Sequence, residues 1–183
     1  SYTYTNPDFV DIDGDGDLDA FVGNGEYIWY FENTGSSNSP AFNSIGAFPF
    51  GLTDVGAYIV PAFVDLDGDG DIDAFLGEDG GDIYYFENTG SSTSPAFDTA
   101  QFAPFSLSNV GEEEISLAVV DIDGDGDLDL FAGVDTGVLE FFRNVSPSIS
   151  TLSPADDATT AVPSNNFTMT FSSAVTAQPG KNI

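Results

Sequence analysis

The sequence lacks cysteine and histidine, and its 183 residues include only two basic side chains, Arg143 and Lys181. Disulfide bonds are therefore excluded, and a zinc site is disfavoured because imidazole and thiolate ligands are missing. Catalytic arrangements that combine serine or cysteine with histidine are excluded as well. We expect no enzymatic activity, because the numerous carboxylates have a better explanation as metal ligands.

The shortage of positive charge also limits the partners. Thirty-one acidic residues give a formal net charge of −29. A surface of this sign repels nucleic acid and anionic lipid headgroups, so we expect no nucleic-acid partner. No apolar run approaches the length of a membrane span, so we expect no membrane insertion.

Aromatic residues, by contrast, are plentiful. Seventeen Phe and seven Tyr contribute to an aromatic share of 14% within a hydrophobic share of 41%. Acidic disordered chains are poor in aromatic residues, because they have no core to bury. The composition therefore predicts a folded chain with a hydrophobic core.

An internal repeat organises most of the chain. The stretch "VDIDGDGDLDAF" at 10–21 returns as "VDLDGDGDIDAF" at 64–75 and as "VDIDGDGDLDLF" at 120–131. The similarity of the first two copies continues through "YFENTGSSxSPAF", whereas the third copy departs after residue 144. A period of about fifty residues is typical of stacked supersecondary units such as four-stranded propeller blades.

Short runs of β-forming residues between Gly, Asp and Pro support this interpretation. In the second copy we expect one strand to contain Phe63 and Val64, and two more at 73–77 and 83–88. A fourth strand is expected after Pro95 and should contain Phe97. Consecutive apolar residues in the third strand of the first copy predict packing on both faces. The predicted fold class is all-β: an array of three four-stranded propeller-type blades with calcium loops, plus a short C-terminal β extension.

The repeat also sets the expected domain boundaries. Residues 1–146 should form the three blades, at about 6–59, 60–116 and 117–146. Residues 147–183 are rich in Ser, Thr and Pro, and "SPADDAT" followed by "FSSAVT" resembles the opening of bacterial Ig-like surface domains. This extension is interpreted as a partial Ig-like domain, as a linker, or as a source of one strand, "FTMTF" at 167–171, donated to an open sheet edge.

The acidic loop has the spacing of a calcium site. Counted from its first aspartate, carboxylates fall at positions 1, 3, 5, 7 and 9, with glycine at positions 4 and 6. Calcium takes six to eight oxygen ligands, and a chain that curls around one point turns alternate side chains inward. We expect side-chain ligands from positions 1, 3, 5 and 9 and a main-chain carbonyl from position 7. Without a cation, each pair of carboxylates about 4 Å apart costs about 1–4 kcal/mol.

Competing explanations fit less well. Magnesium retains its waters and requires tight octahedral geometry. An EF-hand needs glutamate at position 12 and flanking helices, whereas position 12 is Val22, Leu76 or Ala132 here. A solvated acidic turn without a ligand would not repeat the same nine-residue spacing three times.

The motif D-x-D-G-D-G-D-x-D, followed by "FVG", "FLG" or "FAG", resembles the FG-GAP and VCBS repeat families. The resemblance implies calcium-binding blades related to the integrin α-subunit propeller, with about three Ca²⁺ per chain in the loops between first and second strands. The metal ligands implied by position are Asp11, Asp13, Asp15, Asp17 and Asp19, then Asp65, Asp67, Asp69, Asp71 and Asp73, and finally Asp121, Asp123, Asp125, Asp127 and Asp129.

The family resemblance also implies an extracellular or cell-surface location. We therefore expect a calcium-stabilised structural or adhesive module of a bacterial surface or secreted protein. Three blades do not close a ring, so the expected partners are further blades of a longer chain or other copies in a larger propeller or filament. A cell-surface protein or a glycan is a further expected partner. The alternative is a lectin-like, carbohydrate-binding module that uses Trp29, Tyr30, Tyr84 and Tyr85, although core packing explains these aromatic residues better.

Overall fold

A computed structural model of the protein describes residues 4–102, 110, 115–144, 149–153 and 168–171. Within these residues the chain is almost entirely β-structure and turns, with one short 3-10 helix, η1 (Pro49–Gly51). Contacts divide the chain into two units, Ser1–Arg143 and Asn144–Ile183. Among the described residues, no helix has the length and apolar character needed to cross a membrane.

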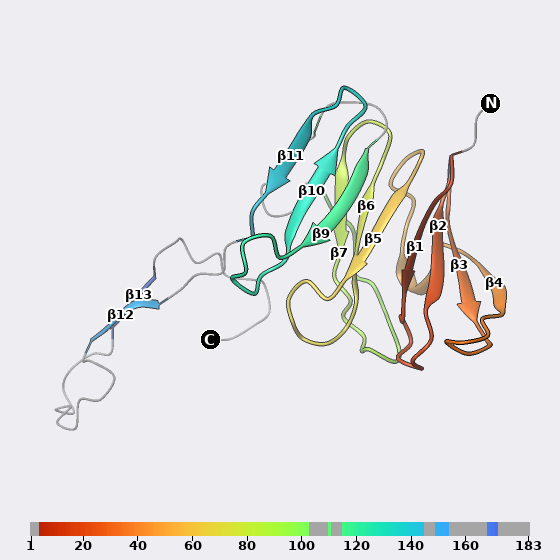
Figure 1. The fold of residues 1–183 in the computed structure, drawn as a ribbon, viewed down its shortest axis with the longest axis horizontal. Coiled ribbons are helices and arrows are strands. Elements are labelled where there is room, and N and C mark those ends of the chain that lie inside the picture. The colour runs from red at the N-terminus through yellow and green to blue at the C-terminus, as the bar shows by residue number, and fades with distance from the viewer. Residues whose placement is uncertain (1–3, 103–109, 111–114, 145–148, 154–167, 172–183) are drawn as a thin grey trace. The chain divides into compact units, whose positions relative to one another are not determined.

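Three antiparallel sheets follow one another along the first unit (Figure 1). The first sheet contains β1 (Asn6–Val10), β2 (Asp19–Gly23), β3 (Ile28–Asn33) and β4 (Phe42–Ala47). The second contains β5 (Val60–Val64), β6 (Asp73–Gly77), β7 (Ile83–Phe86) and β8 (Gln101–Phe102). The third contains β9 (Ser116–Val120), β10 (Asp129–Gly133) and β11 (Leu139–Phe142). Strand order in each sheet follows chain order, so every sheet is a simple meander.

The second unit contributes one antiparallel pair, β12 (Ile149–Ser153) and β13 (Thr168–Phe171). Most of the predicted strand at 167–171 is therefore a strand, and it pairs within its own unit. Residues 1–3 and the three consecutive glutamates at 112–114 in the sequence lie outside the described residues.

One strand prediction was wrong in its position. The fourth strand of the second sheet is β8 (Gln101–Phe102), and Phe97 makes only an isolated bridge with Asn88. The Phe97 backbone N–H donates instead to the Phe50 carbonyl oxygen in the preceding repeat, at 2.8 Å. In the first sheet the equivalent residue, Phe42, does begin the fourth strand. Within its described residues the third sheet has three strands, where four were predicted.

The hydrophobic core lies between stacked sheets. β1 lies against β5, and β5 lies against β9, so the first strands form the contact between neighbouring sheets. One buried cluster, which includes Phe21, joins the first two sheets, and a second, which includes Phe75, joins the second and third. The ring centroids of Phe21 and Phe63 are 4.0 Å apart across the first of these interfaces.

Third-strand aromatic residues contribute to both clusters. Tyr30 and Tyr85 are buried, as core packing predicted, whereas Trp29 and Tyr84 are half-buried. Both faces of β3 are therefore at least half-buried, which agrees with the consecutive apolar residues at 28–31.

Candidate metal centre

Each acidic stretch forms the loop that joins the first two strands of its sheet. The loops connect β1 to β2, β5 to β6 and β9 to β10. All three emerge at the same end of the stacked sheets, the lower end in Figure 1. The repeated sequence is thus converted into three equivalent loops on one rim of the molecule.

Two glycines in each loop adopt the left-handed conformation that the turn requires. In the second loop, Gly68 has φ of 75° and Gly70 has φ of 95°, and the other two loops have closely similar values. Both glycine N–H groups donate to the carboxylate of Asp65, Gly68 to Oδ1 at 2.8 Å and Gly70 to Oδ2 at 3.1 Å. Because residues with a side chain rarely adopt this φ, glycine at these positions is dictated by the backbone.

The same hydrogen bonds recur in the third loop. Gly124 and Gly126 donate to Asp121 at 2.7 and 3.1 Å. In the first loop, Gly16 donates to Asp11 Oδ2 at 3.0 Å. The main chain of each loop therefore wraps around its own first carboxylate and fixes the direction in which that carboxylate points.

Carboxylate oxygens converge inside each loop. In each group of three aspartates, one oxygen per residue lies within 4.8 Å of the others. Positions 1, 3 and 5 converge in the first two loops, and positions 1, 3 and 9 converge in the third. The converging residues are Asp11, Asp13 and Asp15; Asp65, Asp67 and Asp69; and Asp121, Asp123 and Asp129.

The aspartate at position 9 connects the acidic loop to the sheet through hydrogen bonds. Asp19 and Asp73 are 2% exposed. Asp19 Oδ1 accepts a hydrogen bond from the Asn33 N–H at 2.7 Å, and Asp19 Oδ2 accepts one from the Tyr30 hydroxyl at 3.1 Å. Asp73 likewise accepts one from the Asn88 N–H at 2.8 Å.

Burial raises the pKa of the carboxylates at position 9 in the first two loops. Removal from water raises the pKa of Asp73 to about 6, although hydrogen bonds from Asn88, Tyr85 and Leu66 oppose the shift. The same cause raises the pKa of Asp19. The shifts mean that burial disfavours the ionised form of Asp19 and Asp73.

The aspartate at position 7 is placed differently from the others. The side chains of Asp17, Asp71 and Asp127 are not among the converging groups. Their backbone N–H groups donate to the carboxylate at position 5, at 2.9–3.1 Å. Partial burial, followed by the neighbouring Asp69, raises the pKa of Asp71 to about 6.

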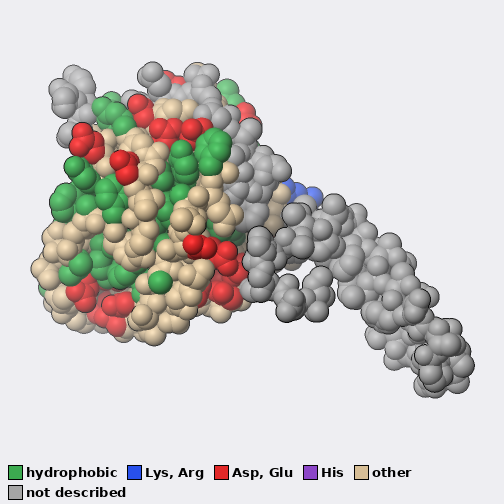
Figure 2. Space-filling model, turned by 180° about the vertical axis from the view of Figure 1, so that it is seen from behind, with side chains coloured by type: hydrophobic (Ala, Val, Ile, Leu, Met, Phe, Trp, Pro, Cys, Tyr) green, Lys and Arg blue, Asp and Glu red, His purple; other side chains and the backbone are tan. Residues whose placement is uncertain are grey.

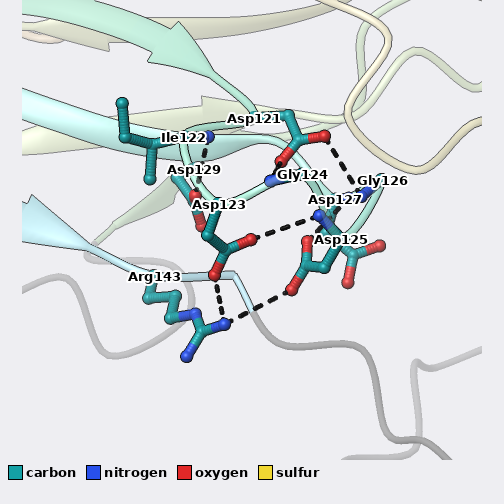
Figure 3. A network of polar contacts seen from close by, with 9 residues as sticks. All are labelled: Asp121, Ile122, Asp123, Gly124, Asp125, Gly126, Asp127, Asp129 and Arg143. Atoms are coloured by element: carbon teal, nitrogen blue, oxygen red, sulfur yellow. Dashed lines mark hydrogen bonds and ion pairs between the residues drawn. The ribbon is translucent and has the colours of Figure 1, made fainter.

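The third loop contains a feature that the repeat pattern alone did not predict. Arg143 forms ion pairs with Asp123 and Asp125, the latter at 3.6 Å between Arg143 Nη2 and Asp125 Oδ2 (Figure 3). Glu32 and Glu87 occupy the same repeat position in the first two sheets. The available signal was this switch from Glu to Arg within the matching sequences "FEN" and "FRN".

Acidic side chains also lie at the surface outside the third loop. Figure 2 shows acidic side chains in separate patches, with hydrophobic side chains exposed between them. Hard carboxylate oxygens on a preformed turn match the ligands that calcium prefers, and they match zinc poorly. The donor set and its geometry therefore fit calcium.

Comparison with known families places these observations in context. The model of the FG-GAP-like repeat matches residues 11–76 and again residues 65–132, so the two matches together extend over well over half of the chain. Both matches begin at the first aspartate of an acidic loop and end in the second strand of the next sheet. The VCBS and Ig-like resemblances remain predictions, and neither the curated proteins nor the solved structures gave a match. The chain belongs to the FG-GAP-like repeat family.

Proposed function

We propose that this chain is a calcium-stabilised structural or adhesive module of an extracellular or cell-surface protein, with no catalytic role. The observation that carries the proposal is the threefold recurrence of converging carboxylates on a glycine turn. FG-GAP repeats often bind calcium and are typical of extracellular proteins, which supports both parts of the proposal.

The proposed ligands are the fifteen loop aspartates in three groups of five. Positions 1, 3, 5 and 9 would offer carboxylates, and position 7 would offer its carbonyl. A bound divalent cation supplies positive charge that offsets the repulsion among these carboxylates. Because position 9 is already bonded to the third strand, a loop held by calcium would also hold the first three strands of its sheet together.

Each sheet acts as a propeller-type blade in this proposal. The sheets stack through their first strands and expose their acidic loops on one rim, which supports that architecture. Further blades would extend the array, supplied either by a longer chain or by other copies of this one. The module would thus serve as a rigid spacer or as a docking surface outside the cell.

Calcium titration calorimetry tests the proposal loop by loop. Asp13→Asn, Asp67→Asn and Asp123→Asn each remove one converging carboxylate, so each variant should lose one of three calcium sites. Asp98→Asn is the matched control, because Asp98 is exposed and its carboxylate accepts hydrogen bonds from the neighbouring Thr99, away from the acidic loops. Unchanged stoichiometry in all three loop variants would contradict the assignment.

Carbohydrate binding is the alternative. Half-buried Trp29 lies beside exposed Tyr27, with ring centroids 6.0 Å apart, and such a pair could stack on a sugar. The burial of Tyr30 and Tyr85 argues against their use in sugar binding. A glycan array probed in millimolar calcium separates the two functions, because a structural module should bind no glycan.

A further inference from the structure

Each sheet has a set of five apolar residues on one face, which we call the forward face. In the first two sheets the forward face packs against the next sheet along the chain. The residues occupy the same repeat positions in every sheet. They are Val10, Ile12, Phe21, Ile28 and Tyr30 in the first sheet; Val64, Leu66, Phe75, Ile83 and Tyr85 in the second; and Val120, Ile122, Phe131, Leu139 and Phe141 in the third.

The strand register confirms that the three sets are equivalent. Phe21 pairs with Tyr30, Phe75 with Tyr85, and Phe131 with Phe141 in the matching place on the second and third strands. The aromatic rings of these pairs lie 5.0, 5.2 and 4.7 Å apart. The third sheet therefore repeats the geometry of the first two, and not merely their sequence.

Exposure separates the third forward face from the other two. Tyr30 is 3% exposed and Tyr85 is 4% exposed, because the next sheet covers each of them. Phe141, at the same position in the third sheet, is 45% exposed, and Leu139 is 64% exposed. An apolar surface that is buried twice within the chain is thus open on the third sheet.

A complementary surface, the rear face, is open at the opposite end of the stack. On the second sheet the rear face packs against the first sheet, and it contains Pro61, Phe63, Ile72 and Phe97. The equivalent residues of the first sheet are all exposed, and they are Pro7, Phe9, Leu18 and Phe42. The ring pair recurs as well: Phe63 and Phe97 lie 6.2 Å apart, and Phe9 and Phe42 lie 6.4 Å apart.

Glycine on the second strand marks the place of closest approach. A Cβ added at Gly77 would lie 2.9 Å from Ile115 Cγ2, because the third sheet is packed there. At the equivalent Gly133, the one described atom that an added Cβ would meet within 4 Å is Ser116 Oγ of the same sheet, at 2.8 Å. A strand interior favours other residues over glycine unless another backbone approaches closely.

We propose that the forward face of the third sheet binds the rear face of the first sheet of a second copy of this chain. One chain carries both halves of an interface that it already forms twice internally, so the packing mode needs no new complementarity. The contact is head-to-tail and therefore produces a ring or an open filament. This inference deepens the assembly part of the proposed function by naming its surfaces.

Charge should control the strength of the contact. Each copy is strongly acidic, so long-range repulsion opposes association while the apolar contact favours it. Added salt screens the repulsion, and association of the full chain should therefore strengthen with ionic strength. An interface built on ion pairs would weaken instead.

Sedimentation velocity of the full chain in millimolar calcium tests the surfaces. Phe141→Asp on the forward face and Phe9→Asp on the rear face should each raise the dissociation constant at least about tenfold. Phe102→Asp is the control, because Phe102 is 56% exposed but belongs to the second sheet, which contributes to neither open face. Thermal unfolding of each variant checks that it is folded. If Phe141→Asp or Phe9→Asp does not fold, Leu139→Asp replaces the forward-face variant and Leu18→Asp replaces the rear-face variant.

Mixing the two variants gives the most specific result. Phe141→Asp and Phe9→Asp should each remain monomeric when measured separately. An equimolar mixture should form a dimer and no larger assembly, because each variant keeps one intact face. Self-association that survives both variants would overturn these surfaces while leaving assembly itself standing. A wild-type chain that stays monomeric in calcium at high salt would overturn assembly too, but would leave the calcium proposal to its own titration.

Discussion

At the scale of single residues, Arg143 distinguishes the third loop from the other two. Its guanidinium forms ion pairs with Asp123 and Asp125, two of the carboxylates proposed as calcium ligands. A tethered cation competes with a free one for the same oxygens. We therefore predict that Arg143→Glu, which restores the residue type of the other repeats, strengthens calcium binding at the third loop by about tenfold.

The reciprocal exchange is the control for this prediction. Glu87→Arg places a guanidinium at the same repeat position beside the second loop and should weaken the calcium site there. Titration calorimetry reads both variants against wild type. If Arg143→Glu left every affinity unchanged, the ion pairs would have no bearing on the metal.

The raised pKa values of Asp73 and Asp71 determine how the stability of the calcium-free protein should depend on pH. Burial raises the pKa of each to about 6 in the folded chain, above the ordinary value of about 4. Between these values the folded state holds more protons than the unfolded state, so stability falls as pH rises from about 4 to about 6. In excess chelator, the melting temperature should therefore be lower at pH 6 than at pH 4.

The calcium-loaded protein should show the opposite trend, because protons and calcium compete for the same carboxylates. Its melting temperature should fall as pH is lowered from 6 to 4. Identical pH profiles with and without calcium would contradict the role given to these aspartates.

Spacing in the sequence predicted that alternate aspartates turn inward, and the carboxylates at positions 1, 3 and 5 do converge in the first two loops, whereas positions 1, 3 and 9 converge in the third. It could not distinguish the buried position 9, whose burial depends on hydrogen bonds from a strand fourteen or fifteen residues later. The ion pairs of Arg143 were also beyond reach, because they depend on where β11 ends relative to the third loop.

At the scale of elements, Asn33 and Asn88 stabilise the loops that follow the third strands of the first and second sheets. Asn88 Oδ1 accepts hydrogen bonds from the Gly90 and Ala96 N–H groups, at 3.0 and 2.9 Å. Asn33 makes the same two bonds with Gly35 and Ala41, at 3.1 and 2.9 Å. The repeated sequence "ENTGSSxSPA" therefore encodes a loop closed by its own asparagine.

Asn88→Ala should lower the free energy of unfolding by about 2–4 kcal/mol, because two backbone donors lose their acceptor at a buried position. Asn43→Ala is the control, since Asn43 is exposed on β4, and it should stay within about 0.5 kcal/mol of wild type. Urea denaturation measures both. Equal effects of the two changes would contradict the stabilising role.

Phe97 shows why the element prediction succeeded for most strands and failed for one. Three strands per repeat could be read from β-forming runs between turn residues. Phe97 also has the residue type of a strand, but its side chain fills the space between two sheets and its N–H bonds to Phe50. The residues next to Phe97 in the sequence do not indicate that Phe50, 47 residues earlier, is its hydrogen-bond partner.

At the scale of the whole molecule, the three acidic loops lie at one end of an apolar stack of sheets. Sheet packing buries aromatic residues between neighbours, while the three loops concentrate like charge at one end. The repeat in the sequence predicted stacked units with one acidic loop each, whereas the common end at which the loops lie is visible only in the structure. The open forward and rear faces became visible only when equivalent residues could be compared for burial.

Thermal unfolding with metal analysis, in millimolar calcium and in excess chelator, shows whether calcium stabilises the folded chain. A site held at about a hundred times its Kd adds about 2.7 kcal/mol of stability, so several filled loops should raise the melting temperature markedly. The account predicts this rise together with about three calcium ions per chain, and a smaller effect of magnesium. Equal melting temperatures with calcium and with chelator, and no retained calcium, would contradict it.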